Sequence, residues 1–224
     1  RQDVAAMMNA MAAPPFALTI QRQPEAPDMS DDPGTTGGNP MRFRQICVTW
    51  LVVLSWPALV LGDAANKIFA TRRNGDGCLV HTVTSAYQAG STDIRVLPPD
   101  HIEEGRRYPV LYLLPVEPGQ ETSWGDPFRE VKRHDLHNKH NTIFVFPEFS
   151  ALPWYADHPT NPAIRQETYF MKVVVPLGEM HYPISDERFL LGFSKSGWGA
   201  WVLLLRHPDV FCRAAAWDAP MMME

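Results

Sequence analysis

Cysteine and net positive charge are scarce in this chain. Its 224 residues include three cysteines, too few for a disulfide-dense scaffold, and the formal net charge is −5. No strongly basic segment indicates binding to nucleic acid. Hydrophobic residues make up 45% and charged residues 20%, which disfavours full disorder, collagen and a coiled coil. The chain is long enough for one sizeable core with additional tails.

A recognisable metal site is also missing. His134, His137 and His140 recur every three residues, a spacing that invites comparison with metal ligands. No cysteine or carboxylate cluster completes a first coordination shell around them. We therefore interpret the three histidines as part of a solvated helix face, and we expect neither a metal nor another cofactor.

Long apolar runs are limited to one. Residues 46–61 are almost wholly apolar, they follow Met41, Arg42 and Arg44, and small residues come after them. This order is typical of a secretory signal peptide, so we predict one over residues 41–64 and a secreted or periplasmic product. The alternative is a membrane anchor, although the run is slightly shorter than the span of about 20 residues that a transmembrane helix needs.

The first 40 residues have little apolar periodicity and hold six of the 21 prolines. Such a segment buries too little surface to offset the entropy of ordering it. We predict that residues 1–40 are disordered, or that they lie upstream of a true start at Met41. The folded part is then expected within residues 65–224.

Residues 65–224 alternate between strand-like and helix-like patterns. Alternating strand order with helices between the strands predicts an α/β fold with a mainly parallel sheet and flanking helices. Helices are expected to begin at Asp126 and at Asn161, and Pro176 should kink or end the second one. The predicted strands cover residues 79–84, 92–97, 110–114, 142–146, 188–191 and 211–217, and a further apolar helix covers residues 198–205.

The most informative string places Ser194 between a buried strand and an apolar helix. Gly192 lies two residues before this serine, and Ser196 and Gly197 follow it closely. Small residues let the strand and the helix close around a strained central residue, which lifts its hydroxyl out of the packing. Ser194 is therefore the predicted nucleophile, and the backbone N–H of Lys195 is a predicted oxyanion donor. The alternative is an ordinary strand-to-helix connection with an N-capping serine.

Four stretches together resemble the putative-esterase (esterase D-like) family of α/β-hydrolases. They are residues 108–114, Phe146-Pro147, residues 192–197 and residues 206–211. The resemblance covers about residues 78–220. It implies an α/β-hydrolase fold and ester hydrolysis or acyl transfer by a Ser-acid-His triad.

A second oxyanion donor is expected in the loop after the strand at 110–114. The family often has His-Gly there, but this chain has Pro115, Val116 and Glu117. Proline has no N–H, so the donor must come from Val116 or Glu117.

The loop after the strand at 142–146 carries Trp154, Tyr155 and Asp157. Ligand sites form at the carboxyl ends of parallel strands, so these side chains are candidate substrate contacts. The alternative is a loop that they hold together by packing. We expect a small-molecule or glycan ester as the partner, and no nucleic acid.

The sequence after Ser194 contains no clear candidates for the acid and the base of a catalytic triad. α/β-Hydrolases order them as serine, acid and histidine. His207 lies 13 residues beyond Ser194, roughly 20 Å along a helix, too far for a hydrogen bond. Asp218 is a candidate acid, or else a turn or cap residue. His81, His101, His158 and His181 precede Ser194 and so break the order.

Two functional hypotheses follow from this gap. The first is an exported serine hydrolase of the carboxylesterase type, present as an incomplete copy whose triad acid and histidine lie beyond residue 224. The second is a non-catalytic, esterase-like domain that binds an ester or glycan at the cell surface. A serine without a base is a weak nucleophile, so the two hypotheses predict different reactivity of Ser194.

Overall fold

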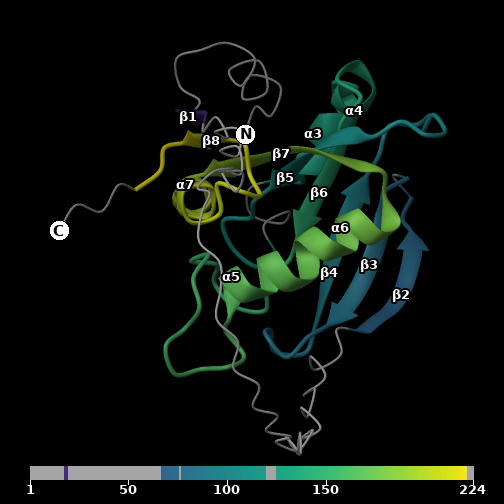
Figure 1. Ribbon diagram of the computed structural model, residues 1–224. Coiled ribbons are helices and arrows are strands. Elements are labelled where there is room, and N and C mark those ends of the chain that lie inside the picture. The colour runs from purple at the N-terminus through teal and green to yellow at the C-terminus, as the bar shows by residue number, and fades with distance from the viewer. Residues whose placement is uncertain (1–17, 20–66, 76, 120–124, 221–224) are drawn as a thin grey trace, which may run out of the picture. The chain divides into compact units, whose positions relative to one another are not determined.

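The computed structural model describes residues 18–19, 67–75, 77–119 and 125–220 (Figure 1). The predicted signal peptide at 41–64 lies outside the described residues. The same is true of the predicted disordered segment, apart from residues 18–19. In the described part, no helix has the length and apolar character needed to cross a membrane.

The centre of the fold is a mixed sheet whose middle strands are parallel. Its eight strands have the order β1-β8-β7-β5-β6-β4-β3-β2. β6, β5, β7 and β8 pair in parallel, whereas β1 and the strands β4, β3 and β2 pair antiparallel. This arrangement confirms the predicted α/β class. The strands are β1 (Leu18–Thr19), β2 (Lys67–Arg73), β3 (Leu79–Thr84), β4 (Ser91–Leu97), β5 (Tyr108–Leu113), β6 (Ile143–Pro147), β7 (Ile184–Phe193) and β8 (Arg213–Trp217).

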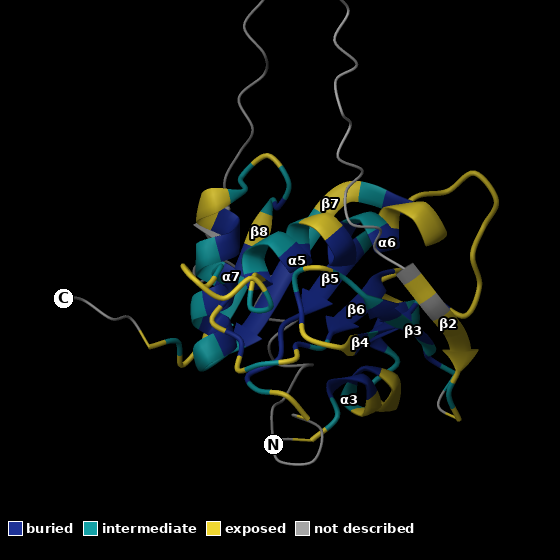
Figure 2. Cartoon of the chain, turned by 90° about the horizontal axis from the view of Figure 1, so that it is seen from below, coloured by how far each residue is buried: buried dark blue, intermediate teal, exposed yellow. Residues whose placement is uncertain are grey.

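Helices cover both faces of this sheet (Figure 2). Successive side chains of a strand point to opposite faces, so β5 contributes to two cores. Val110 and Tyr112 pack with residues of α6 and α7, and Leu111 and Leu113 pack with residues of α3. The helical segments are α3 (Pro127–Arg133), α4 (Leu136–Lys139), α5 (Gln166–Tyr169), the π-helical η1 (Phe170–Val174), α6 (Val175–His181) and α7 (Lys195–Arg206).

The helix before β7 differs from its sequence-based prediction at its start. It begins at Gln166 and not at Asn161. The side chain of Asn161 accepts a hydrogen bond from the backbone N–H of Ala163 and so stabilises a local turn in place of a helix start. The predicted apolar stripe is correct, because Phe170, Val173, Val174 and Leu177 are all buried.

Pro176 does not end this helix, and the helix remains buried after it, at Leu177. The helix continues to His181, but a π-helical turn precedes the proline, and the N–H of Val175 donates to the carbonyl of Phe170. A proline ring clashes with the carbonyl four residues earlier in a regular α-helix. The wider turn relieves that clash, so the chain remains helical through Pro176.

Candidate active site

Ser194 lies in a sharp turn between β7 and α7. Its backbone has φ 49° and ψ −124°, a combination that L-residues rarely adopt. The N–H of Ser194 donates to the carbonyl of Trp217 at 2.7 Å, and its carbonyl accepts from Gly197 at 2.9 Å. The strand, turn and helix therefore occur as predicted. Ser194 occupies the N-cap position of α7 but makes no side-chain capping bond, so its hydroxyl does not cap the helix in this structure. Whether Ser194 is the nucleophile stays a prediction.

The residues around Ser194 explain why this turn closes. A Cβ on Gly192 would collide with the backbone of Ser196 and Gly197, so only glycine fits there. Ser196 is fully buried, and its hydroxyl accepts from the N–H of Phe193 and donates to the carbonyl of Phe193, both at 2.8 Å. The serine that replaces the usual last glycine of the motif thus holds the end of β7 against the first turn of α7.

The predicted oxyanion donors lie on two different elements. Lys195 is the first residue of α7, and a helix N-terminus favours developing negative charge. The other candidates follow β5, where the N–H of Leu114 donates to the carbonyl of Leu191 at 2.9 Å. Val116 is buried and Glu117 is half-buried. The assignment of Val116 or Glu117 as the second donor stays a prediction.

Trp154 contacts the side chain of Lys195, the first residue of α7. Its side chain is 47% exposed, and the Lys195 ammonium lies over its ring at 5.1 Å from the centroid. The side chain of Gln166 holds this part of the loop, because it accepts from the N–H of Trp154 at 2.7 Å and donates to the carbonyl of Leu152 at 2.9 Å. Trp154 is thus a partly exposed aromatic residue that contacts the side chain of the residue directly after Ser194. Nothing in the sequence pattern had singled out Gln166.

Tyr155 is turned the other way and is fully buried. Its hydroxyl donates to the carbonyl of Pro115 at 2.5 Å, and its ring occupies the space that a Cβ on Gly199 would need. Burial raises the pKa of Tyr155 well above its ordinary value of 10.0, so the hydroxyl stays protonated. In this structure both ends of the side chain contact protein.

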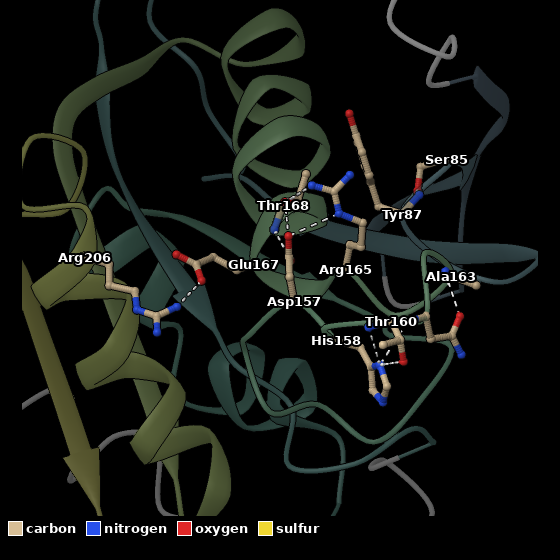
Figure 3. A network of polar contacts seen from close by, with 11 residues as sticks. Ser85, Tyr87, Asp157, His158, Thr160, Ala163, Arg165, Glu167, Thr168 and Arg206 are labelled. Carbon is tan, nitrogen blue, oxygen red and sulfur yellow. Dashed lines mark hydrogen bonds and ion pairs between the residues drawn. The ribbon is translucent and has the colours of Figure 1, made fainter.

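Asp157 belongs to a network that ties the same loop to α5 (Figure 3). It accepts hydrogen bonds from the backbone N–H and the hydroxyl of Thr168 and from Arg165. Burial opposes ionisation, but these hydrogen bonds and the Arg165 charge outweigh it and lower the pKa of Asp157. The carboxylate therefore stabilises the loop, and its predicted contact with substrate stays a prediction.

The structure brings Asp218, but not His207, close to the turn backbone. Asp218 is exposed, has φ 50° and directly follows Trp217, whose carbonyl binds the N–H of Ser194. His207 lies at the far end of α7, where it pairs with Glu167 at 2.9 Å. Its exclusion as a base is consistent with this position, and the role of Asp218 as the acid stays a prediction.

Within the described ranges, no hydrogen bond joins the Ser194 hydroxyl to a histidine. His81 hydrogen-bonds to Thr71 and Tyr182, and the ring of His158 accepts from the backbone of its own loop. Among these same residues, no three His, Cys, Asp or Glu side chains are grouped so as to hold a metal ion.

Comparison with known proteins places this geometry in a family. The family model described as "Putative esterase" matches residues 85–222. Among solved structures, an S-formylglutathione hydrolase from Agrobacterium tumefaciens is 16% identical with a TM-score of 0.52, covering 68% of this chain and 62% of that one. A ferulic acid esterase is 22% identical with a TM-score of 0.51, covering 65% of this chain and 60% of that one.

These likenesses to solved structures show a shared fold, and the chain spans about three-fifths of the length of either protein. No curated protein matches the chain significantly. The family model covers more than half of the chain and includes β7, Ser194, α7 and β8. The chain therefore belongs to the putative-esterase family and has the α/β fold of esterase structures.

Proposed function

We propose that this protein is a serine hydrolase that cleaves carboxylic esters through Ser194. The observation that carries the proposal is the backbone of Ser194, which is held at φ 49° and ψ −124° between β7 and α7. Attack of the Ser194 oxygen on the ester carbonyl forms a tetrahedral intermediate. Its collapse releases the alcohol and leaves an acyl group on Ser194, which water then removes to regenerate the serine.

The charge that develops on the carbonyl oxygen needs donors already in place. The N–H of Lys195 is one, supported by the helix N-terminus of α7. We assign the N–H of Val116 as the second. Removal of one such donor costs about 100- to 1000-fold in rate in a comparable serine hydrolase.

The proton of Ser194 needs a base. All eight histidines of the sequence lie within the described ranges, and none of them hydrogen-bonds to the Ser194 hydroxyl there. The chain also covers only 62% and 60% of the two esterase-fold structures above. We therefore propose a base other than these histidines in their present positions. The acid is either Asp218, beside the turn, or a further residue outside the same ranges.

For the substrate we propose a small-molecule or glycan ester. Trp154 is partly exposed and contacts the side chain of Lys195, the neighbour of Ser194, so its ring offers an aromatic surface for a planar or sugar ring of the substrate. One protein of similar fold is a ferulic acid esterase, which supports a small aromatic ester as the substrate.

A second candidate is a non-catalytic domain of the same family that binds an ester or glycan. Among the described residues no histidine hydrogen-bonds to the Ser194 hydroxyl, which favours it, because without a base this serine is a weak nucleophile. Both candidates use the same surface, so reactivity of Ser194 separates them.

The test is covalent labelling with a fluorophosphonate probe. If Ser194 is activated, the chain is labelled, Ser194→Ala abolishes labelling, and Ser185→Ala leaves it intact as a matched control. A folded chain that is never labelled, and that still binds an ester ligand in calorimetry, supports the non-catalytic domain and contradicts the hydrolase.

We also propose that the protein is exported, as the pattern at residues 41–64 indicates. Expression from Met41 should give a secreted or periplasmic product whose N-terminus follows Gly62 or Ala64. A membrane-bound product that retains residues 41–64 supports the anchor instead, and a cytosolic product contradicts both.

A further inference from the structure

We propose that Tyr155 is a positioning residue for the oxyanion hole, an inference that rests on the proposed function of Ser194. Tyr155 binds the carbonyl of Pro115 and thereby sets the direction of the N–H of Val116. Its role is to hold this donor at the correct place relative to the turn at Ser194, without touching the substrate itself.

The first step is the geometry of one peptide group. The carbonyl of Pro115 and the N–H of Val116 belong to the same planar peptide unit, and in a trans peptide they point in opposite directions. A hydrogen bond that holds the carbonyl therefore orients the N–H as well. The Tyr155 hydroxyl makes this bond at 2.5 Å in a fully buried setting, where no water competes for the carbonyl.

The second step is the way in which Tyr155 itself is held. Its backbone has φ 57°, which is strained for a bulky residue and persists only where the surroundings determine it. The ring packs edge-to-face on Phe149 at 5.4 Å between centroids. The ring also lies against Gly199, where any side chain would overlap with the ring atoms.

The third step is that Tyr155 contacts both elements that carry the proposed oxyanion donors. Gly199 lies in the first half of α7, the helix whose first residue is Lys195, and Pro115 lies in the loop after β5. One rigid side chain thus contacts both elements that carry the proposed donors. A displacement of about 1 Å in such a site costs up to 100-fold in rate, so this link has kinetic consequences.

The hydroxyl is also suited to a constant structural role. Because burial raises its pKa well above 10.0, Tyr155 donates to Pro115 at any pH at which an esterase works. The pH dependence of catalysis should therefore not report on this group.

The test compares Tyr155→Phe with Tyr169→Phe. Tyr169 is also fully buried, packs edge-to-face on Phe149 at 5.6 Å, and hydrogen-bonds to Thr92 at 2.8 Å. Each variant keeps its ring and loses one buried hydroxyl, so general effects on stability are matched. We expect Tyr155→Phe to slow fluorophosphonate labelling, and to lower kcat with KM unchanged, by about 10- to 100-fold. Tyr169→Phe should change neither; equal rates in the two variants would overturn the proposal.

A second measurement does not depend on activity. Hydrogen–deuterium exchange of residues 114–119 should be faster in Tyr155→Phe than in the wild type, and unchanged in Tyr169→Phe. If the wild type is never labelled, the hydrolase proposal fails, and exchange still decides whether Tyr155 positions this loop. Unchanged exchange in Tyr155→Phe would contradict the positioning role.

Discussion

The strained backbone of Ser194 leads to a prediction that does not require activity. Ser194→Ala and Ser194→Gly both remove the hydroxyl, but they differ in backbone freedom. Glycine adopts φ 49° and ψ −124° without a Cβ clash, whereas alanine keeps the strain of the native serine. We expect Ser194→Gly to be the more stable of the two.

The magnitude follows from two opposing terms. A non-glycine residue in a sparsely populated backbone region costs about 1–3 kcal/mol. Glycine costs about 0.5–1 kcal/mol relative to alanine in ordinary structure, because it loses more entropy on folding. The difference leaves Ser194→Gly more stable by about 1 kcal/mol, which corresponds to a Tm higher by about 2–4 °C in a domain of roughly 150–250 residues.

The assay is thermal unfolding followed by circular dichroism, with Arg129 as a control position. Arg129 is exposed on α3, where glycine should be less stable than alanine by about 1 kcal/mol. The preference for glycine over alanine should therefore change sign between the two positions. If Ser194→Gly is less stable than Ser194→Ala by the margin found at Arg129, the turn at Ser194 is not strained and the reasoning fails.

Two further predictions concern packing and pH. Gly192→Ala should lower the free energy of unfolding by about 3 kcal/mol, because the new Cβ would collide with the backbone of Ser196. Gly75→Ala places its Cβ in open space and should be near neutral. Urea unfolding compares the two variants, and equal losses of stability would contradict the predicted collision. Burial, with the nearby charge of His181, lowers the pKa of His81 below 6.5 in the folded chain, so the unfolded chain binds more protons below that pH. Stability should therefore fall as the pH drops through about 6.5, and His81→Gln should flatten this dependence in urea titrations at several pH values; an unchanged slope would contradict the assignment.

Local patterns predicted most of the sheet. The apolar runs that became β5 and β6 are buried on both faces of the sheet, so their composition alone identified them. β2 was not predicted, because Lys67–Arg73 is a charged edge strand without the apolar pattern of a strand. Its backbone pairing with β3 stabilises it instead. The start of α5 was misplaced because Asn161 forms a turn with a signal much like that of a helix N-cap.

The candidate site divides in the same way. Ser194 and Gly192 were identified from spacing, because a strand, a tight turn and a helix are specified by neighbours in the chain. The opposite orientations of Trp154 and Tyr155 were not predictable from their adjacent positions. Trp154 remains exposed beside Lys195, while the positive φ of Tyr155 turns its ring into the core.

The sequence by itself determined the α/β class, the position of the strand–turn–helix at Ser194 and the absence of a suitably placed histidine just after it. Each of these depends on residues close together in the chain, where periodicity and small-residue spacing act directly. Only the tertiary structure decided that Tyr155 connects Pro115 with Gly199, and that the end of β8 holds the N–H of Ser194. These contacts join segments separated by tens of residues, so local sequence patterns do not specify them. They depend on close packing of the Tyr155 ring in the core and on the pairing of buried backbone groups.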